Sequence, residues 1–354
     1  TTDGAVWITH LKPAAADGPT FKLPATMVLG ERVQDVPEIP APPLASSHPQ
    51  PPYEKGASGG ISLPSAATWQ DIGYHEASGV GYLHFDFHNG AMSTQQCRRL
   101  REAYLQAAER PVKVIALMGG ADFWCNGIHL NLIEAAASPA DESWANINAM
   151  NDLCLALLEN TRQITLAAMQ GNAGAGGVFL ALAADRVLAR EGVILNPHYK
   201  GMGNLYGSEY WTYLLPRRVG AERARTITEN RLPIGARRAR ELGLLDDCFG
   251  ASVGEFRAGV RDRAEALAAE ADVLLAEKRE RRARDEAAKP LAAYRAGELD
   301  HMKLNFYGFD PSYHVARYHF VHRVPHAWTP LHLAHHRQNQ WARRQALIGK
   351  ETAA

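Results

Sequence analysis

A glycine-rich loop, Gly171 to Gly177, is the segment of this sequence best suited to hold an electron-rich group. An apolar run of strand composition, residues 164–169, precedes it, and an apolar segment of helix composition, residues 178–184, follows. A helix that begins at such a loop presents free backbone N–H groups and the positive end of its dipole. These groups bind an anion, or an oxygen atom that becomes one during a reaction. The alternative is that the glycines only allow tight packing of helix against strand.

A second loop of the same kind lies upstream, between residues 119 and 130. The apolar run 112–118 is predicted to be a buried strand, and another predicted helix follows the loop. Two units of strand, glycine loop and helix, each offering a backbone N–H, are what an oxyanion hole for a thioester requires.

The elements that must position these loops alternate between strands and helices. Residues 80–87 and 187–195 have the pattern of strands, and residues 95–108 and 142–160 that of helices, the first of which Ser93 would cap. This alternation predicts an α/β fold. From residue 256 to 284 the sequence is highly charged at helical spacing, which predicts a solvated helix or an arm that covers an interface.

The bulk composition excludes several classes of protein. Lys plus Arg equals Asp plus Glu, at 38 each in 354 residues, so neither nucleic acid nor an anionic membrane is expected as a partner. No apolar run approaches the roughly 20 residues of a membrane span. The four cysteines are dispersed, which predicts a reducing cytoplasm and no disulfide framework. The sequence starts without Met or a signal peptide and reads as part of a longer protein.

The two glycine loops carry a resemblance. Trp124–Leu130 followed by Gly171–Asp185 resembles the paired signature of the crotonase (enoyl-CoA hydratase/isomerase) family, over roughly residues 70–270. The resemblance implies a ββα superhelix and assigns the oxyanion N–H groups to Asn126 and Gly176. It also implies that the loop residues beside them bind the coenzyme A thioester, namely Cys125, Gly127, Gly174, Ala175 and Gly177.

The departures from that family concern the acids and bases. Phe179 and His198 stand where a hydratase carries its two catalytic glutamates, and His129 replaces a common aspartate. With both carboxylates absent, hydration of an enoyl-CoA is not expected.

A more specific resemblance lies in residues 196–203 and 206–212, with further matches at residues 7–12 and 329–335. These segments are similar to the C-terminal domain of the HypX/HoxX family of nickel–iron hydrogenase maturation factors. The resemblance implies that a formyltransferase domain using 10-formyl-tetrahydrofolate precedes this region. The crotonase-like domain would then split formyl-CoA into carbon monoxide and coenzyme A, and the carbon monoxide would become a ligand of the hydrogenase iron. Hydrogenase precursor and other maturation proteins are the implied partners.

The same resemblance divides the chain into four parts. Residues 1–35, with two strand-like runs at 5–11 and 21–29, would be the tail of the formyltransferase domain. Residues 36–67 have the Pro-, Ser- and Gly-rich composition of a linker. Residues 68–270 would form the crotonase-like core, and residues 271–354 a helical and extended tail.

Decarbonylation needs a base near the formyl C–H and a proton for the departing thiolate. We expect Glu209, with a pKa raised by burial among aromatic residues, to be the base, and Tyr199 to orient the substrate or relay the proton. The alternative is that Glu209 caps the following helix. His198 and His129 are weaker candidates, and the alternative for each is a hydrogen-bonded structural histidine.

The phosphates of coenzyme A need cations, for which Arg98, Arg99 and Lys200 are candidates. No metal site is predicted, because the C-terminal histidines (His314, His319, His322, His326, His332, His335 and His336) are irregularly spaced and lack Cys or carboxylate partners. Two other functions stay open: another hydrolase or lyase reaction on an acyl-CoA, and a non-catalytic module that binds coenzyme A or a hydrogenase assembly partner.

Overall fold

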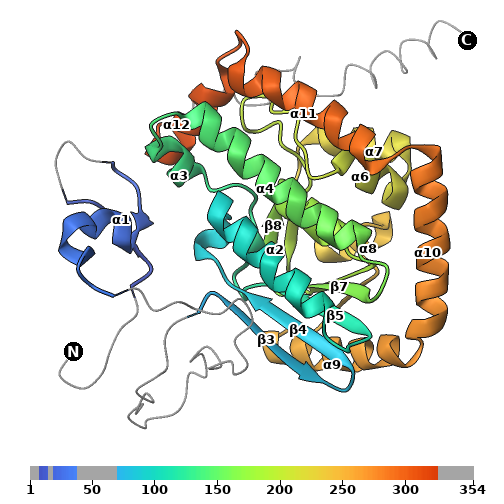
Figure 1. Ribbon diagram of the computed structural model, residues 1–354. Coiled ribbons are helices and arrows are strands. Elements are labelled where there is room, and N and C mark those ends of the chain that lie inside the picture. The colour runs from blue at the N-terminus through green and yellow to red at the C-terminus, as the bar shows by residue number, and fades with distance from the viewer. Residues whose placement is uncertain (1–7, 15–18, 38–69, 326–354) are drawn as a thin grey trace, which may run out of the picture.

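Two β-sheets form the centre of the molecule in the computed structural model, which describes residues 8–14, 19–37 and 70–325 (Figure 1). The larger sheet has six strands in the order β12-β9-β7-β5-β4-β3. Strands β3 and β4 are antiparallel, and the other neighbouring pairs are parallel. The bounds are Ile72–Ala77 (β3), Val80–Phe85 (β4), Val114–Met118 (β5), Ile164–Met169 (β7), Arg186–Arg190 (β9) and Asp247–Phe249 (β12).

The smaller sheet has the order β11-β10-β8-β6, and the two glycine loops of the sequence analysis follow its strands β6 and β8. Strands β6, β8 and β10 are parallel, and β11 is antiparallel to β10. Strands β6, β8 and β10 each follow a strand of the larger sheet, so the chain winds as β5–β6, β7–β8 and β9–β10, with helices following each pair, whereas β11 follows α7. The bounds are Phe123–Cys125 (β6), Asn172–Gly174 (β8), Ile194–Asn196 (β10) and Ile234–Gly235 (β11).

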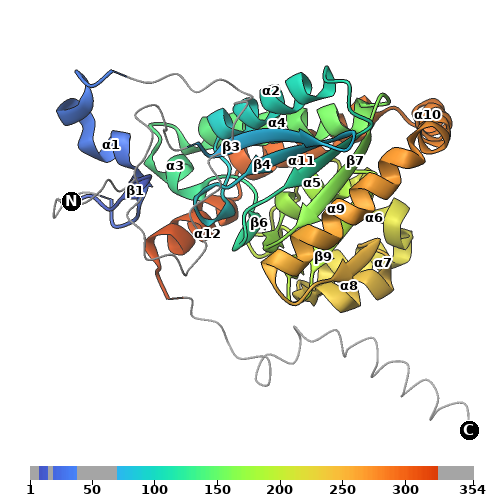
Figure 2. The same cartoon turned by 90° about the horizontal axis from the view of Figure 1, so that it is seen from below.

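Helices cover both faces of the larger sheet (Figures 1 and 2). Alternate residues of β5 point to opposite faces, as the period of a strand requires. Ile115 and Leu117 face the core formed with α2 (Thr94–Ala108) and α4 (Pro139–Glu159). Val114 and Ala116 face the core formed with α9 (Val253–Ala269) and α10 (Ala271–Ala288). Both strands are buried on both faces, and every residue of β5 and β7 except Thr165 is apolar, which confirms the two buried strands predicted there.

The remaining helices lie around the smaller sheet and include the two helices near the C-terminus, α11 and α12. Helix α11 lies against α4 and α6 and continues into α12 (Figure 1). Their bounds are Leu130–Ala135 (α3), Gly176–Leu182 (α5), Trp211–Val219 (α6), Ala221–Asn230 (α7), Ala236–Leu242 (α8), Leu291–Tyr307 (α11) and Ser312–His322 (α12). Ser93 caps α2 in a capping box with Gln96, as its position before the helix predicts.

Two segments that were each predicted to be a single element are divided in the structure, one into two strands and the other into two helices. Residues 187–195 form the end of β9 and the start of β10, because Gly192 turns the chain at φ 84° and sends it from one sheet to the other. The charged region 256–284 is divided between α9 and α10 at Glu270. Its apolar side is packed on the sheet, so it is only partly solvated.

The N-terminal segment packs against α3 and α12. Its first strand-like run contains β1 (His10–Leu11), paired with β2 (Leu23–Pro24). The second predicted strand is wrong beyond Pro24, where the chain forms α1 (Ala25–Leu29) and a 3₁₀ turn, Gly30–Val33. Phe21 and Leu23 share a small apolar cluster with Val321 of α12. The linker predicted at residues 36–67 lies, from residue 38 on, outside the described residues.

A buried ion pair fastens α10 to the larger sheet. Lys278 Nζ lies 2.5 Å from Asp185 Oδ2 and also donates to the carbonyl oxygen of Gln163, 2.9 Å away. Asp185 accepts two further hydrogen bonds, from the backbone N–H and the hydroxyl of Thr165. Only 3% of the Lys278 side chain is exposed, and burial lowers the pKa of this ammonium group. The carboxylate is therefore needed to compensate a buried charge.

Asp185→Asn is expected to lower the free energy of unfolding by about 3–5 kcal/mol, because it leaves the Lys278 ammonium without its carboxylate. Urea unfolding measures this, with Asp262→Asn, an exposed residue of α9, as the matched control. Equal stability of the two variants would contradict the structural role of the pair.

Candidate active site

Three loops meet where parallel strands of the smaller sheet end. Cys125 at the end of β6 pairs with Ala173 of β8, and Gly174 pairs with Asn196 at the end of β10. The loops that leave these strands therefore start side by side. These three loops contain the site residues that the sequence predicts: Asn126 after β6, Gly176 after β8, and Tyr199 and Glu209 after β10. Ligands of α/β proteins characteristically bind at the carboxyl ends of parallel strands.

The two glycine loops approach each other as closely as backbones allow. A Cβ on Gly177 would collide with the carbonyl oxygen of Cys125. A Cβ on Gly127 would lie 3.5 Å from the backbone nitrogen of Gly176. The Trp124 indole donates to the Gly177 carbonyl oxygen at 2.9 Å and joins the loops. The glycines thus allow the two loops to pack tightly, and these are the same loops that are predicted to bind the substrate oxygen.

The turn into α5 is strained. Ala175, the N-cap of α5, has φ 47° and ψ −126°, a conformation that residues with a Cβ rarely adopt. Its backbone N–H donates to the carbonyl oxygen of Asn196 at 2.9 Å, which fixes the turn. Gly176 is the first residue of α5, and within the described part of the chain its N–H has no hydrogen-bond partner. It is therefore available to a substrate oxygen.

The predicted partner of Gly176 is engaged elsewhere. The backbone N–H of Asn126 donates to the carbonyl oxygen of Gly90 at 2.7 Å, and its side-chain amide donates to that of Asn89 at 2.7 Å. In this conformation the Asn126 N–H is therefore not free, and its assignment as the second oxyanion donor stays a prediction. Gly90 turns the chain at φ 67° directly opposite Asn126, and this places its carbonyl against the first loop.

Tyr199 and Glu209 form a buried pair. The Tyr199 hydroxyl donates to Oε2 of Glu209 at 2.5 Å, and Glu209 is only 2% exposed. Burial raises the pKa of the Glu209 carboxyl to about 8, against the opposing effect of the hydrogen bond from Tyr199. Burial and the neighbouring carboxylate raise the pKa of the Tyr199 hydroxyl well above its usual range. The pair can hold or accept a proton near neutral pH.

The carboxyl of Glu209 lies against the start of α5. A Cβ built on Gly176 would lie 2.6 Å from Oε1 and 3.1 Å from Oε2 of Glu209. The free N–H and the carboxyl thus border the same space, a few ångströms apart. An oxygen bound by this N–H would hold its own carbon within reach of the carboxyl, which is the geometry that general base catalysis requires.

Two contacts orient the Tyr199 ring. Phe179 of α5 stacks on it, with ring centroids 5.4 Å apart and an interplanar angle of 15°. On another side the ring packs on Gly207, where a Cβ would collide with it. The phenylalanine that stands at a hydratase's glutamate position therefore supports the tyrosine, and the site's carboxylate comes from a different loop.

Glu209 does not cap the helix that follows. Helix α6 begins at Trp211, its N-cap is Tyr210, and no side chain caps it. Glu209 and Tyr210 both have positive φ, 60° and 59°, so the chain turns sharply and sends the carboxyl toward Gly176. The helix-cap interpretation of Glu209 is wrong for this reason. The carboxyl accepts a hydrogen bond from Tyr199 and lies against Gly176, whereas Tyr206 and Trp211 pack on each other.

The other predicted residues have more peripheral positions. His198 is half-buried beside Arg231, and burial lowers its pKa. Within the described residues no hydrogen bond joins it to Glu209. His129 is structural, because its Nδ1 accepts from the N–H of Leu132 and caps α3. Among the candidate cations, Lys200 and Arg98 are exposed, whereas Arg99 forms an ion pair with Asp71 at 2.6 Å.

The site also contains residues that sequence reasoning did not single out. Asn151 of α4 is fully buried, and its Oδ1 accepts from the Ser208 hydroxyl and the Glu209 N–H, both at 2.7 Å. The signal for Asn151 in the sequence is a side-chain amide within the apolar face of the helix predicted for residues 142–160. Glu298 of α11 lies behind the same loop, and its position among many charged residues offered no such signal.

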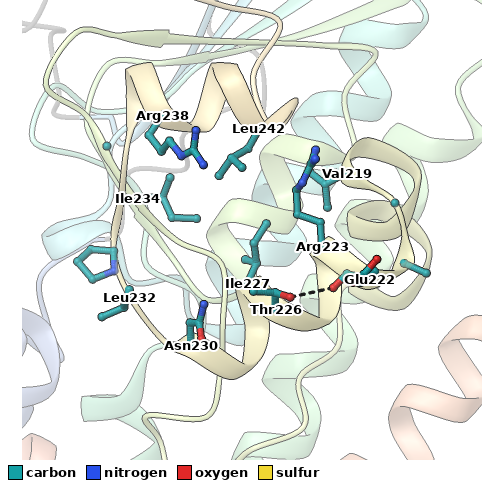
Figure 3. A pocket seen from close by; sticks show the side chains of 14 residues that line it. Val219, Glu222, Arg223, Thr226, Ile227, Asn230, Leu232, Ile234, Arg238 and Leu242 are labelled. Carbon is teal, nitrogen blue, oxygen red and sulfur yellow. Dashed lines mark hydrogen bonds between the residues drawn. The ribbon is translucent and has the colours of Figure 1, made fainter. Parts of the chain in front are cut away.

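Some features lie apart from these loops. A surface pocket of about 920 Å³ between α7 and α8 is lined by Ile227, Leu232, Arg223 and Arg238, and shares no lining residue with the site (Figure 3). In residues 8–14, 19–37 and 70–325, no group of three or more His, Cys, Asp or Glu side chains is placed to hold a metal. His326, His332, His335 and His336 lie outside that range. No helix in the described segments is long and apolar enough to cross a membrane.

Comparison with known proteins agrees with this geometry. The family model for enoyl-CoA hydratase/isomerase matches residues 76–329, and the chain belongs to this family. Its sequence is 50% identical, over 339 residues, to the hydrogenase maturation factor HoxX of Bradyrhizobium diazoefficiens. This alignment covers 95% of the chain and 55% of that protein. The predicted crotonase-like α/β fold and the similarity to the HypX/HoxX family are confirmed.

Solved structures give the same result. The crystal structure of HypX from Aquifex aeolicus in complex with tetrahydrofolic acid superposes with a TM-score of 0.84 and 48% identity, over 96% of this chain and 57% of that one. An enoyl-CoA hydratase from Bacillus halodurans superposes with a TM-score of 0.61 at 18% identity, over 70% of this chain and 99% of that one, which is a likeness of fold alone. The chain thus spans a little over half the length of the maturation factors it matches.

Proposed function

We propose that this part of the protein converts formyl-CoA into carbon monoxide and coenzyme A, and thereby supplies the carbon monoxide ligand during maturation of nickel–iron hydrogenase. The observation that carries the proposal is the Glu209 carboxyl, buried, hydrogen-bonded by Tyr199 and packed against Gly176 at the free end of α5. The formyl group would come from 10-formyl-tetrahydrofolate through a further domain of the longer protein. The similarity to HypX, crystallised with tetrahydrofolic acid, supports that assignment.

The proposed reaction starts with the formyl oxygen hydrogen-bonded to the Gly176 N–H. Glu209 removes the proton from the formyl carbon, and the C–H electron pair stays on that carbon as the lone pair of carbon monoxide, while a lone pair of the formyl oxygen forms the third carbon–oxygen bond. The carbon–sulfur bond breaks at the same time, and the sulfur leaves with its electron pair as thiolate. Glu209, now protonated, returns the proton to sulfur, directly or through Tyr199. The products are carbon monoxide and coenzyme A, and no further reactant is consumed.

The second donor for the formyl oxygen would be the Asn126 N–H, which requires that its bond to Gly90 be shared or released when substrate binds. Cys125, Gly127, Gly174, Ala175 and Gly177 would line the thioester beside it. For the phosphates of coenzyme A we favour the exposed Lys200 and Arg98 over Arg99, whose guanidinium is engaged by Asp71. We infer a cytoplasmic setting, in which four unpaired cysteines are stable.

The direct test is to incubate the chain with formyl-CoA and to trap carbon monoxide with haem, while formate is measured in parallel. Carbon monoxide in equal amount to free coenzyme A supports the proposal. Formate in its place assigns thioester hydrolysis. If coenzyme A binds but neither product forms, the chain is a binding module, and the proposal falls.

Tyr199→Phe is expected to reduce carbon monoxide release by about 10- to 100-fold, the value of one hydrogen bond to a charged group. The lost hydrogen bond normally lowers the pKa of Glu209, so its loss raises that pKa. Because a base works only when ionised, the rise of kcat/KM with pH should move to higher pH. A pH profile measures this, with Tyr318→Phe on α12 as the control. An unshifted profile would contradict the role given to the hydroxyl.

A further inference from the structure

One face of α11 supplies hydrogen-bond acceptors to the loop that carries Glu209, here called loop 206–212. The N–H of Tyr206 donates to Oδ1 of Asn305 at 3.0 Å. The N–H of Gly207 lies 3.1 Å from the sulfur of Met302. Residues 298, 302 and 305 are four and three positions apart, so they share one face of the helix. That face is turned toward loop 206–212 along its length.

Glu298 makes the strongest of these contacts. Its Oε2 accepts from the N–H of Tyr210 at 2.9 Å, and its Oε1 accepts from the N–H and the hydroxyl of Thr212 at 2.8 and 2.6 Å. The residue is 1% exposed. These N–H groups belong to the start of α6, which has no cap of its own, so the carboxylate also meets the positive end of that helix.

The conformation that Glu298 stabilises is a costly one. Glu209 and Tyr210 occupy the left-handed region, and a residue with a side chain is held there at a cost of roughly 1–3 kcal/mol. Asn151 of α4 binds the N–H of Glu209, and Glu298 binds the N–H of Tyr210. The strained pair of residues is thus held from two helices, at two successive backbone N–H groups.

We propose that Glu298 is a positioning residue of this site, which holds the strained turn at Glu209 and Tyr210 so that the Glu209 carboxyl stays against Gly176. The inference rests on the proposed function for its catalytic meaning, and its structural part stands independently of the substrate. It extends the site to the C-terminal tail, well beyond the crotonase-like core predicted for residues 68–270.

Glu298 also acts on Glu209 through its charge. The negative charge of Glu298 contributes to the raised pKa of Glu209, so a neutral residue at 298 lowers that pKa. Burial raises the pKa of Glu298 itself to about 7, and Lys289 partly opposes this. The other titratable groups that interact with one or both carboxyls are Tyr199, Tyr206, Tyr210, Cys97, Cys125 and Cys154.

The test compares Glu298→Gln with Asp300→Asn, an exposed carboxylate on the same helix. A glutamine keeps one oxygen for Thr212 but turns an NH₂ group toward the N–H of Tyr210. We expect the backbone amides of Tyr210 and Thr212 to exchange with solvent at least 10-fold faster in Glu298→Gln, and those of β7 to be unchanged. This measurement needs no substrate.

With formyl-CoA, Glu298→Gln should reduce kcat by about 10- to 100-fold, as expected when a catalytic group is displaced by about 1 Å. The rise of kcat/KM with pH should also move to lower pH, whereas Asp300→Asn should change neither kcat nor this profile. A purely structural residue would not move the profile. Asn305→Ala, which removes only the contact to Tyr206, should accelerate exchange at that amide alone.

The outcomes separate the two proposals. If Glu298→Gln exchanges like Asp300→Asn at Tyr210 and Thr212, or leaves the pH profile of an active enzyme unshifted, the positioning role is wrong. If the native chain releases no carbon monoxide from formyl-CoA, the proposed function fails. Faster exchange in Glu298→Gln would then still establish that α11 holds loop 206–212.

Discussion

Glu209→Gln is expected to reduce carbon monoxide release from formyl-CoA by about 10²- to 10⁴-fold, the usual contribution of a positioned general base. Glutamine keeps the size of the side chain and can still accept the hydrogen bond from Tyr199, but it cannot take a proton. Stopped-flow detection of carbon monoxide with haem measures the loss. In the native enzyme, kcat/KM should rise with pH through about 8, the raised pKa of Glu209, and this rise should be absent from the residual activity of the variant.

At pH 8.5 the Glu209→Gln variant should be more stable than the native protein, and the direction of this change follows from the pKa of Glu209. Glu209 has a pKa of about 8 in the folded chain and near 4.5 when unfolded, so between these values the folded state binds more protons. The native protein therefore loses stability as pH rises through this window, whereas the glutamine variant does not. Urea unfolding at pH 5 and pH 8.5 measures the difference.

The matched control for Glu209→Gln is Glu222→Gln, an exposed carboxylate at the start of α7. This control should keep both native activity and the native pH dependence of stability. Full activity in Glu209→Gln would remove the carboxyl from the reaction. A variant that loses activity and is also less stable at pH 8.5 would show a folding defect, and would contradict the burial of an ionisable group at this position.

Gly176→Ala is expected to reduce the same activity by about 10²- to 10³-fold, the effect of losing one oxyanion donor. The added Cβ would lie 2.6 Å from Oε1 and 2.7 Å from the carboxyl carbon of Glu209, a distance that real Cβ atoms do not adopt. Either the carboxyl or the first turn of α5 must move, and both changes separate the N–H from the base. The effect should appear mainly in kcat, because the cations proposed for the phosphates of coenzyme A, Lys200 and Arg98, lie outside α5.

Gly297→Ala on α11 is the control for Gly176→Ala, because its added Cβ meets nothing within 4 Å. This helix-interior change should stabilise the protein by about 0.5–1 kcal/mol and leave activity unchanged. Retention of native kcat in Gly176→Ala would exclude both the proposed oxyanion donor and the proximity of Glu209 to it.

The fold and one half of the site could be predicted because their signals are local. The apolar run 164–169, the glycines after it and the cap at Ser93 each determine structure within a few residues, and the structure has β7, the turn into α5 and the start of α2 there. Tyr199 and Glu209 came from a resemblance in a single loop, and they do form a hydrogen-bonded pair.

The rest of the site depends on segments distant in sequence. The N–H of Asn126 is bound by Gly90, 36 residues earlier, and no pattern around Asn126 reveals the direction of that bond. Glu298 is 89 positions after Glu209, in a region where carboxylates are common. The cap interpretation of Glu209 failed because a serine followed by a glutamate does not reveal positive φ angles at residues 209 and 210.

The contacts of α11 bear on how this protein can be divided. A fragment ending at residue 270 would contain both glycine loops, Tyr199 and Glu209, and would satisfy any definition based on the signature motifs. It would nevertheless lack Glu298, Met302 and Asn305, which bind the backbone of loop 206–212. Such a fragment would also lack α10 and the Lys278–Asp185 ion pair, so we expect it to be less stable than the whole chain and to present a disordered loop. In chimaeras between relatives, loop 206–212 and α11 must therefore come from the same parent protein.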